Sequence, residues 1–318
     1  MLTPTAYGAV MAALEFYDDP AEFLRVAGDR LAEDPVLNTV LTTVTERLRD
    51  EDAAGVPVDP ALPRWWLATR DDDGDLTGVG MRTAPFRPYP LYLLPMPDDA
   101  GRALARALHE RDEETLGING ALPAAMVCAE ELARLTGGRA EVGQHTRLFE
   151  LGELVRPATV PPGRLRGATP DDVELALAWY EAFGLDADEQ AGREPGSMHD
   201  TAEDSDTMLR RIAAGRVWFW EDEHGERVHL TGVNPPSYGV ARVGPVYTPK
   251  THRGRGYASA AVAEVSRRIL DEGGRACLFT DQANPTSNKI YEALGYRRVV
   301  DMANVVVLPS DQQLPGAC

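Results

Sequence analysis

One segment constrains the fold of this chain more than any other: a basic, glycine-bearing turn between an apolar strand and a helix. Residues 240–246 are typical of a buried strand, and residues 250–256 read Lys-Thr-His-Arg-Gly-Arg-Gly. A helix with one apolar face is predicted from Tyr257 and is stopped by Asp271 to Gly274. This order brings free backbone N–H groups and the positive end of a helix together, which is an arrangement that binds anions.

The charge of the chain makes this turn stand out. The 318 residues include 32 Lys and Arg against 50 Asp and Glu, which gives a net charge of −18 at pH 7. Lys250, Arg253 and Arg255 therefore form a basic spot that would attract a phosphate-bearing ligand. The acidic balance argues against nucleic acid as a partner and favours a cationic one, such as a polyamine, a basic peptide or an amino sugar.

The turn does not match two common nucleotide-binding loops. No Gly-Lys-Ser/Thr follows the glycines as in a Walker loop, and Ser259 stands where a Rossmann fingerprint has its third Gly or Ala. Instead, residues 253–258 (Arg-Gly-Arg-Gly-Tyr-Ala) resemble the loop that binds the acyl-CoA pyrophosphate in the GNAT superfamily of N-acetyltransferases. The strand at 277–280 and the block at 284–296 resemble the second motif of that family, which extends the resemblance over residues 165–308.

The resemblance implies a fold, a cofactor and a set of site residues, with no metal ligand. The fold is α/β (α+β): two tandem acyl-CoA N-acyltransferase-like domains, each a mixed, mostly antiparallel sheet flanked by helices. The implied reaction is acetyl transfer from acetyl-CoA to a primary amine by direct attack. Tyr291 is the implied catalytic residue, because its hydroxyl, with an ordinary pKa near 10, would protonate the leaving thiolate. The implied cofactor-binding residues are Val246, Tyr247 and Thr248 beside the pantetheine arm, Arg253, Gly254, Arg255, Gly256, Tyr257 and Ala258 around the pyrophosphate, and Asn284 and Asn288 after the next strand.

A free primary amine is mostly protonated at pH 7, so the reaction also needs a proton acceptor. Asp281 is a candidate by its position just beyond a strand. Glu181, Asp186 and Glu221 are further candidates, although most of the acidic side chains are expected to be solvated. His229 and His252 are predicted to be solvated side chains. The sequence leaves the base open.

Periodicity and turn residues predict further elements in the first half of the chain. Asp34-Pro35 places a capping acid before a proline and is predicted to open an amphipathic helix that continues to Leu48. The other expected elements are a hairpin at 65–81, helices at 98–110 and 123–135, and strands near 116–118 and at 144–151.

The same order of elements returns after a linker at residues 155–163, which contain three prolines. Trp65 and Trp66 precede an acidic turn in the first half, as Trp218 to Trp220 do in the second. We predict a duplicated chain, with a degenerate acetyltransferase-like domain at 1–155 and a catalytic N-acetyltransferase domain at 164–310. The alternative is two unrelated α/β units that share similar turn residues.

The first copy lacks the equipment for a cofactor. Residues 85–97 contain five prolines and no glycine, and proline removes the N–H donors that a phosphate needs. One chain is therefore expected to bind one CoA. The first copy would then shape the acceptor pocket, complete an interface or bind a regulator.

Cysteine content and hydropathy indicate a compartment. Cys128, Cys277 and Cys318 are odd in number and far apart, so reduced thiols in a cytoplasm are expected. No apolar run approaches the roughly 18–20 residues that span a bilayer, and no signal peptide is predicted.

Two other functions remain open at this point. The chain could be a non-catalytic acyl-CoA-binding regulatory module, although the presence of Tyr291 argues against this. The acceptor could also be a protein lysine or terminal amine instead of a small molecule, and the acidic segment at 186–206 is predicted to form part of the acceptor side.

Overall fold

The computed structural model describes residues 13–58, 64–83, 91–190, 192–193, 196 and 204–309. The chain folds into two compact units, neither of which is a continuous stretch of sequence. Unit 1 comprises Met1–Glu33, Val44–Gln144 and Met302–Gln312, and unit 2 comprises Asp34–Thr43, His145–Asp301 and Gln313–Cys318.

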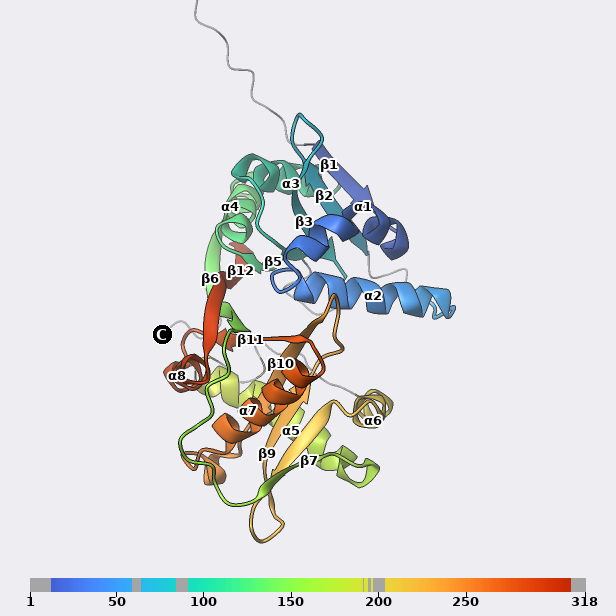
Figure 1. The fold of residues 1–318 in the computed structure, drawn as a ribbon. Coiled ribbons are helices and arrows are strands. Elements are labelled where there is room, and N and C mark those ends of the chain that lie inside the picture. Colours follow the sequence, from blue (N-terminus) through green and yellow to red (C-terminus); the bar gives the residue numbers. More distant parts are fainter. Residues whose placement is uncertain are drawn as a thin grey trace, which may run out of the picture. The chain divides into compact units, whose positions relative to one another are not determined.

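Unit 1 is a sheet with helices on both faces (Figure 1). Its strands follow the order β1-β2-β3-β4-β5-β12, and neighbours are antiparallel except for the parallel pair β4 and β5. The strands are β1 (Ala13–Tyr17), β2 (Trp65–Arg70), β3 (Leu76–Arg82), β4 (Leu91–Leu93), β5 (Gly117–Ala121) and β12 (Tyr296–Pro309), and the helices are α1 (Pro20–Glu33), α2 (Thr39–Ala53), α3 (Asp98–Glu110) and α4 (Ala124–Thr136). The first residues of α2, 39–43, and of β12, 296–301, belong to unit 2.

Two adjacent tryptophans show how β2 joins the layers of unit 1. Successive side chains of a strand point to opposite faces. Trp65 packs in the cluster that α3 and α4 form with the sheet. Trp66 stacks on Phe23 of α1 at 6.3 Å between ring centroids and donates a hydrogen bond from Nε1 to Thr45 of α2 at 2.8 Å. Both tryptophans are therefore core residues.

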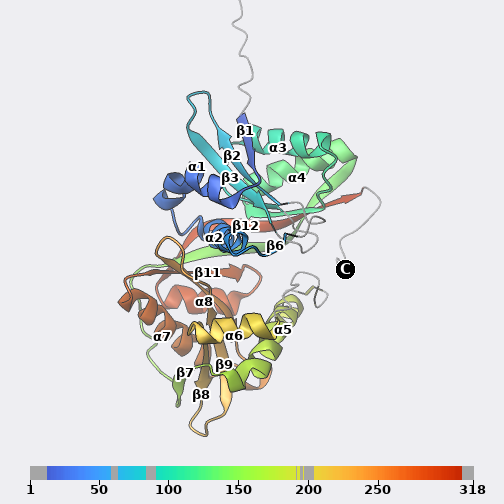
Figure 2. The same cartoon turned by 90° about the vertical axis from the view of Figure 1, so that its right-hand side faces the viewer.

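Unit 2 repeats this arrangement. Its strands follow the order β7-β8-β9-β10-β11-β6, and again only one pair, β10 and β11, is parallel. Helices α5 and α6 pack on one face and α7 and α8 on the other (Figure 2). The elements are β6 (Gly138–Leu151), β7 (Arg164–Gly167), α5 (Val173–Gln190), α6 (Ser205–Ala213), β8 (Val217–Glu221), β9 (Arg227–Val233), β10 (Val240–Tyr247), α7 (Tyr257–Asp271), β11 (Arg275–Asp281) and α8 (Pro285–Ala293). The first residues of β6, 138–144, belong to unit 1.

The two strand orders end in exchanged strands. β6 follows the helices of unit 1 in the sequence, but its residues 146–150 pair with β11 of unit 2. β12 follows the helices of unit 2, but its residues 302–306 pair with β5 of unit 1. The repeated strand order matches the expected duplication, while the domain limits at 155 and 164 stay a prediction.

The parallel strands of unit 2 separate along their length. β10 and β11 pair only from Val240 to Arg242 with Arg275 to Cys277. On its other side, β10 shifts register against β9 between Val243 and Val246. A bulge of this kind bends a strand and ends regular pairing. The sheet therefore opens between the carboxyl ends of β10 and β11.

Most of the expected elements are present, and the differences have local causes. The helix predicted from Asp34-Pro35 begins only at Thr39, because the side chain and carbonyl of Asp34 accept hydrogen bonds from Leu37 and Asn38 in a turn. The short strands β1 and β4 and the helix α6 were not predicted. Cys128 and Cys277 are buried free thiols, and Cys318 lies outside the described residues. Within the described ranges, no helix is both long and apolar enough to cross a membrane.

Candidate functional site

A cavity of about 640 Å³ lies in unit 2 at the opening between β10 and β11. Its wall includes the last turns of α5, the turn before α7 and the starts of α7 and α8. All the residues implied for the cofactor line this cavity except Asn288, and Tyr291 lines it as well. The fold thus brings together residues that the sequence separates by more than forty positions.

The glycine turn presents backbone to the cavity. Gly254 and Gly256 have φ of +75° and +85°, a region that side chains rarely adopt. A Cβ at Gly254 would meet nothing within 4 Å, so an open space adjoins the turn. Gly256 is the N-cap of α7, and the first helical hydrogen bond runs from Ala260 N–H to Gly256 at 3.1 Å. The N–H groups of residues 257–259 consequently have no acceptor within the helix, and these residues line the cavity.

The basic residues of the turn are held differently from one another. Arg253 donates to Asp186 of α5 at 2.6 Å and to the Thr248 carbonyl at 3.0 Å. Lys250 forms ion pairs with Asp186 and Glu189 of the same helix. The exposed Arg255 donates to the Thr251 carbonyl at 3.3 Å. Two of the three cations expected to attract phosphate therefore already have carboxylate partners.

Asp186 also acts on Tyr247, the last residue of β10. Tyr247 is buried and lines the cavity. Burial raises the pKa of Tyr247, and the charge and hydrogen bond of Asp186 raise it further. Asp186 therefore joins α5 to the end of β10 and to the turn, and it is a carboxylate held by cations.

Two histidines lie near the end of β10, and the expectation that both are solvated was wrong for His229. His229 is fully buried on β9, and its two ring nitrogens form hydrogen bonds of 2.7 Å with the hydroxyls of Thr248 and Thr231. Burial lowers the pKa of His229 to about 3, so the ring is neutral. His252 is 17% exposed, and its Nε2 lies 3.7 Å from Glu226. His252 also lines the cavity.

The turn between β11 and α8 is fixed by two asparagines. Asn284 caps α8 by accepting the Ser287 N–H at 3.1 Å, and its amide donates to Gln190 of α5 at 2.7 Å. Asn288 accepts from the Thr280 hydroxyl at 2.5 Å and donates to the Asn284 carbonyl at 2.9 Å. The Asn284 side chain therefore connects α8 to α5, and the Asn288 side chain connects α8 to the end of β11, at this edge of the cavity.

Asp281 is the carboxylate at the end of β11. It lines the cavity, and its side chain is 13% exposed. Its Oδ2 accepts from Arg193 at 2.8 Å and its Oδ1 accepts from Ala283 N–H at 2.8 Å. Arg193 in turn donates to the fully buried Asp188 of α5 at 3.3 Å. The carboxylate is thereby fixed in orientation beside the cavity.

Tyr291 packs in a buried cluster and also lines the cavity. Its ring is 7% exposed and meets Tyr296 edge to face, with 6.0 Å between ring centroids. Burial raises the pKa of Tyr291, which keeps the phenol protonated. A neutral phenol beside the cavity is a hydrogen-bond donor and not a base.

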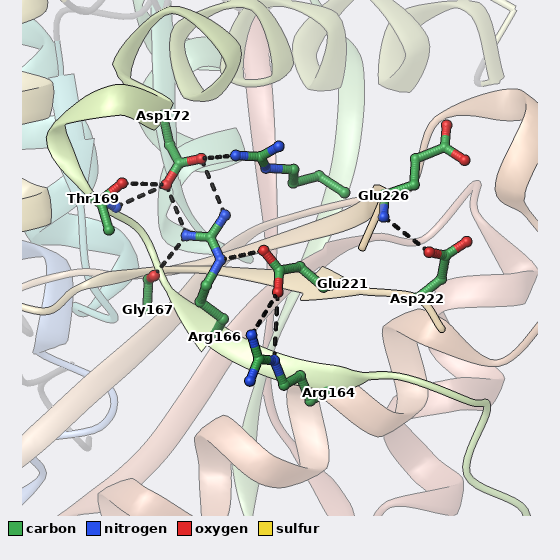
Figure 3. Close-up of polar contacts among 9 residues, drawn as sticks. Arg164, Arg166, Gly167, Thr169, Asp172, Glu221, Asp222 and Glu226 are labelled. Carbon is green, nitrogen blue, oxygen red and sulfur yellow. Dashed lines mark hydrogen bonds and ion pairs between the residues drawn. The ribbon is translucent and has the colours of Figure 1, made fainter. Parts of the chain in front are cut away.

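The other two candidate bases lie away from the cavity. Glu181 is an exposed residue of α5. Glu221 on β8 belongs to an ion-pair network that ties β7 to β8 and to the turn before α5 (Figure 3). In that network Arg166 bridges Glu221 and the buried Asp172, and its hydrogen bond lowers the pKa of Glu221. Glu221 is therefore a structural residue.

The sequence analysis expected residues 186–206 on the acceptor side, and of these 191, 194–195 and 197–203 lie outside the described residues; it did not predict that α5 itself, including Phe183, lines the cavity. Phe183 and Ala187 form one stripe at i, i+4 spacing, and Asp186 and Gln190 form another. The i, i+4 spacing of these residues was visible in the sequence and indicates that each pair shares one face of a helix. The contact with β10 and β11 could not be derived from it, because it depends on how the helix crosses the sheet.

Unit 2 is a mixed sheet that opens between two parallel strands, and a glycine turn leads into a helix at this opening. Comparison then places it among known proteins. Residues 233–305, which contain the turn and Tyr291, match the family model described as FR47-like protein. No curated protein matches the chain.

Solved structures share the architecture over nearly the whole chain. An acetyltransferase of the GNAT family from Colwellia psychrerythraea has a TM-score of 0.53 and 10% sequence identity, over 93% of this chain and 99% of that one. A GCN5-related N-acetyltransferase from Sphaerobacter thermophilus has a TM-score of 0.56 and 14% identity, over 95% and 98%. A tandem GNAT protein from the clavulanic acid biosynthesis pathway has a TM-score of 0.52 and 14% identity, over 95% and 100%. The chain has the fold of these GNAT acetyltransferases, and the fold that its two motifs implied is confirmed.

Proposed function

We propose that unit 2 is an acetyl-CoA-dependent N-acetyltransferase that acts on a primary amine. One observation supports this proposal above the others. A single cavity is lined by the glycine turn, by the residues at the start of α7 whose N–H groups have no acceptor within the helix, and by Tyr291. The residues fit the cofactor, because a Cβ at Gly254 would occupy open space and because backbone donors stand beside that space.

When bound, acetyl-CoA supplies an activated thioester. The N–H groups of residues 257–259 would hold its pyrophosphate, and the backbone of residues 246–248 would orient its pantetheine arm. The amine nitrogen forms a bond to the acetyl carbon while the carbon–sulfur bond breaks, and one proton leaves the nitrogen while one is gained by the sulfur. Tyr291 lines the cavity and would donate a proton to that sulfur, a role that suits a phenol whose raised pKa keeps it neutral.

Asp281 is our candidate for the carboxylate that accepts the proton lost by the amine nitrogen. Its position beside the cavity, fixed by Arg193 and by a backbone N–H, supports this assignment. Asp186 is less suitable, because Arg253 and Lys250 both pair with it.

The test is release of free thiol from acetyl-CoA in the presence of a panel of primary amines, with calorimetry of CoA binding in parallel. We expect binding together with amine-dependent thiol release, and a mass increase of 42 Da, the mass of an acetyl group replacing hydrogen, in the amine. Binding without amine-dependent release would instead support a non-catalytic acyl-CoA-binding module.

A further inference from the structure

His229 of β9 and two threonines form a row of polar side chains that ends at the cavity. Nε2 of His229 lies 2.7 Å from the hydroxyl of Thr231, and Nδ1 lies 2.7 Å from the hydroxyl of Thr248. His229 and Thr231 are fully buried, whereas Thr248 is half-buried and lines the cavity. The hydrogen bonds therefore run from the interior of the sheet to the place where a ligand would lie.

The ring of His229 offers one donor and one acceptor to these hydroxyls. Burial lowers the pKa of His229 to about 3, so the imidazole is neutral and carries a single proton. One threonine must then donate its hydroxyl proton to the ring, and the other must accept the proton of the ring. The threonine that accepts keeps its own hydroxyl proton free for a third group.

Burial decides which of the two threonines accepts. Among the residues that the structure describes, the Thr231 hydroxyl has one hydrogen-bond partner, Nε2 of His229. Trp218 and Trp220 lie next to this pair on β8 and pack against clusters that include residues of α7. If Thr231 accepted the ring proton, its own proton would be buried without an acceptor, which is unfavourable. Thr231 therefore donates to Nε2, and Nδ1 carries the ring proton and donates it to Thr248.

We infer that His229 is a positioning residue that sets the Thr248 hydroxyl as a hydrogen-bond donor into the cavity, where it binds a carbonyl oxygen of the pantetheine arm of acyl-CoA. The inference rests on the proposed function, because it takes this cofactor as the occupant of the cavity. Thr248 directly follows β10, beside which the arm would lie. The amide carbonyls of the arm are hydrogen-bond acceptors that match a hydroxyl donor.

Thr248 is held on two sides before any ligand binds. Its backbone carbonyl accepts a hydrogen bond from Arg253 at 3.0 Å, and its hydroxyl accepts the proton of His229. The bond to the ring does not use up the hydroxyl, since a hydroxyl has two lone pairs and one proton. A donor that is already oriented loses little conformational freedom when the cofactor arrives.

The position of the ring proton can be observed in the full chain without a ligand. Nitrogen-15 labelling of histidine and NMR correlation of the ring nitrogens with the carbon-bound ring protons distinguish the two neutral tautomers, and His229→Leu identifies the signals by their loss. We expect the proton on Nδ1. A proton on Nε2 would make Thr248 the donor to the ring and would overturn the inference, whether or not the protein is an acetyltransferase.

Two variants of Thr248 separate its hydroxyl from its shape. Thr248→Val removes the hydroxyl and keeps the shape, whereas Thr248→Ser keeps the hydroxyl. By calorimetry, we expect Thr248→Val to raise the Kd for CoA about three- to tenfold and Thr248→Ser to change it less than about twofold. A matched ligand is 3′-phospho-ADP, which has the nucleotide and the pyrophosphate of CoA but not its arm. Its Kd should be the same for both variants and the unaltered chain.

A variant of the histidine tests whether it acts through Thr248. His229→Leu removes the ring donor, and we expect it to weaken CoA binding about as much as Thr248→Val does. The variant that combines both changes should lose no more affinity than either alone, because both remove the same directed donor. Thermal unfolding checks that the variants fold, and the tautomer measurement on the unaltered chain depends on none of them.

The remaining outcomes separate this inference from the proposed function. An unchanged Kd for CoA in Thr248→Val would overturn the inference while leaving acetyl transfer intact. An equal loss of affinity for 3′-phospho-ADP would place the hydroxyl at the pyrophosphate and overturn its assignment to the arm. Additive losses in the combined variant would show that His229 does not act through Thr248. Absence of CoA binding to the unaltered chain would instead overturn the proposed function.

Discussion

The glycine turn allows a sharp test, because a second glycine with the same backbone strain stands at the far end of the same helix. Gly256, at the start of α7, has φ of +85°, and Gly273, just after its end, has φ of +79°. A Cβ at Gly256 would meet only Pro161, at 3.9 Å, and one at Gly273 would meet nothing within 4 Å. Glutamate at either position should therefore cost about 1–2 kcal/mol of folding stability through strain.

The expected difference between the two variants lies in CoA binding. A carboxylate at Gly256 would stand about 4 Å from a bound phosphate, where one pair of like charges costs about 4 kcal/mol at an effective dielectric constant of 20. This corresponds to about three orders of magnitude in Kd. Gly273 is on the order of 25 Å away along the helix, well beyond the Debye length of about 8 Å at physiological salt, so its charge should not be felt.

Isothermal titration of CoA into Gly256→Glu, Gly273→Glu and the unaltered chain measures this difference, and thermal unfolding checks that both variants fold. Loss of binding in Gly256→Glu alone is expected. If Gly256→Glu binds CoA within about threefold of Gly273→Glu, the pyrophosphate does not lie at this turn and the cofactor assignment fails.

Three further outcomes are expected. Tyr291→Phe should lower kcat by roughly 10²–10⁴-fold with little change in CoA affinity, because the hydroxyl acts only as charge develops on sulfur; an unchanged kcat would remove Tyr291 from the mechanism. Burial lowers the pKa of His229 from 6.5 to about 3. As the pH falls, the imidazole is therefore protonated in the unfolded chain before it is protonated in the folded one, and the folded state loses stability from pH 6.5 down towards pH 3. Between pH 6.5 and 5 this loss is about 2 kcal/mol, and urea unfolding of His229→Gln should show a correspondingly smaller loss; an equal loss would contradict the buried neutral ring. Titration should give one CoA per chain, and two would show that the first half of the chain also holds a cofactor site.

Much of the fold could be predicted from local sequence signals. The hairpin of β2 and β3, with its acidic turn, and the helix at 98–110 depend on contacts between near neighbours, and both are found where expected. β4 was missed because it has three residues, Leu91–Leu93, too few to show a period. The exchange of β6 and β12 could not be seen, because strand pairing between distant segments depends on the whole sheet.

Some features of the candidate site could likewise be predicted from the sequence, and others could not. The glycine turn was visible because its backbone conformation requires glycine and its neighbours follow directly in the sequence. The partners of Arg253 and Asp281 were not visible, since Asp186 and Arg193 lie 67 and 88 residues away. The prediction for His229 was wrong for the same reason. Its burial comes from the sheet around β9, and the residues next to it in the sequence do not indicate that burial.

The pairing of the turn's cations also bears on how the cofactor would be held. Lys250 and Arg253 are neutralised by Asp186 and Glu189, so the N–H groups at the start of α7 and the side chain of Arg255 remain as the main attraction for a pyrophosphate. Hydrogen bonds made in contact are screened far less by salt than attraction between separated charges. We therefore expect the Kd for CoA to rise less than about tenfold between 0.05 and 0.5 M NaCl, roughly a change in Debye length from 14 to 4 Å. A rise of about a hundredfold or more, measured by calorimetry at constant pH, would show instead that the basic side chains carry the binding and leave their acidic partners when CoA arrives.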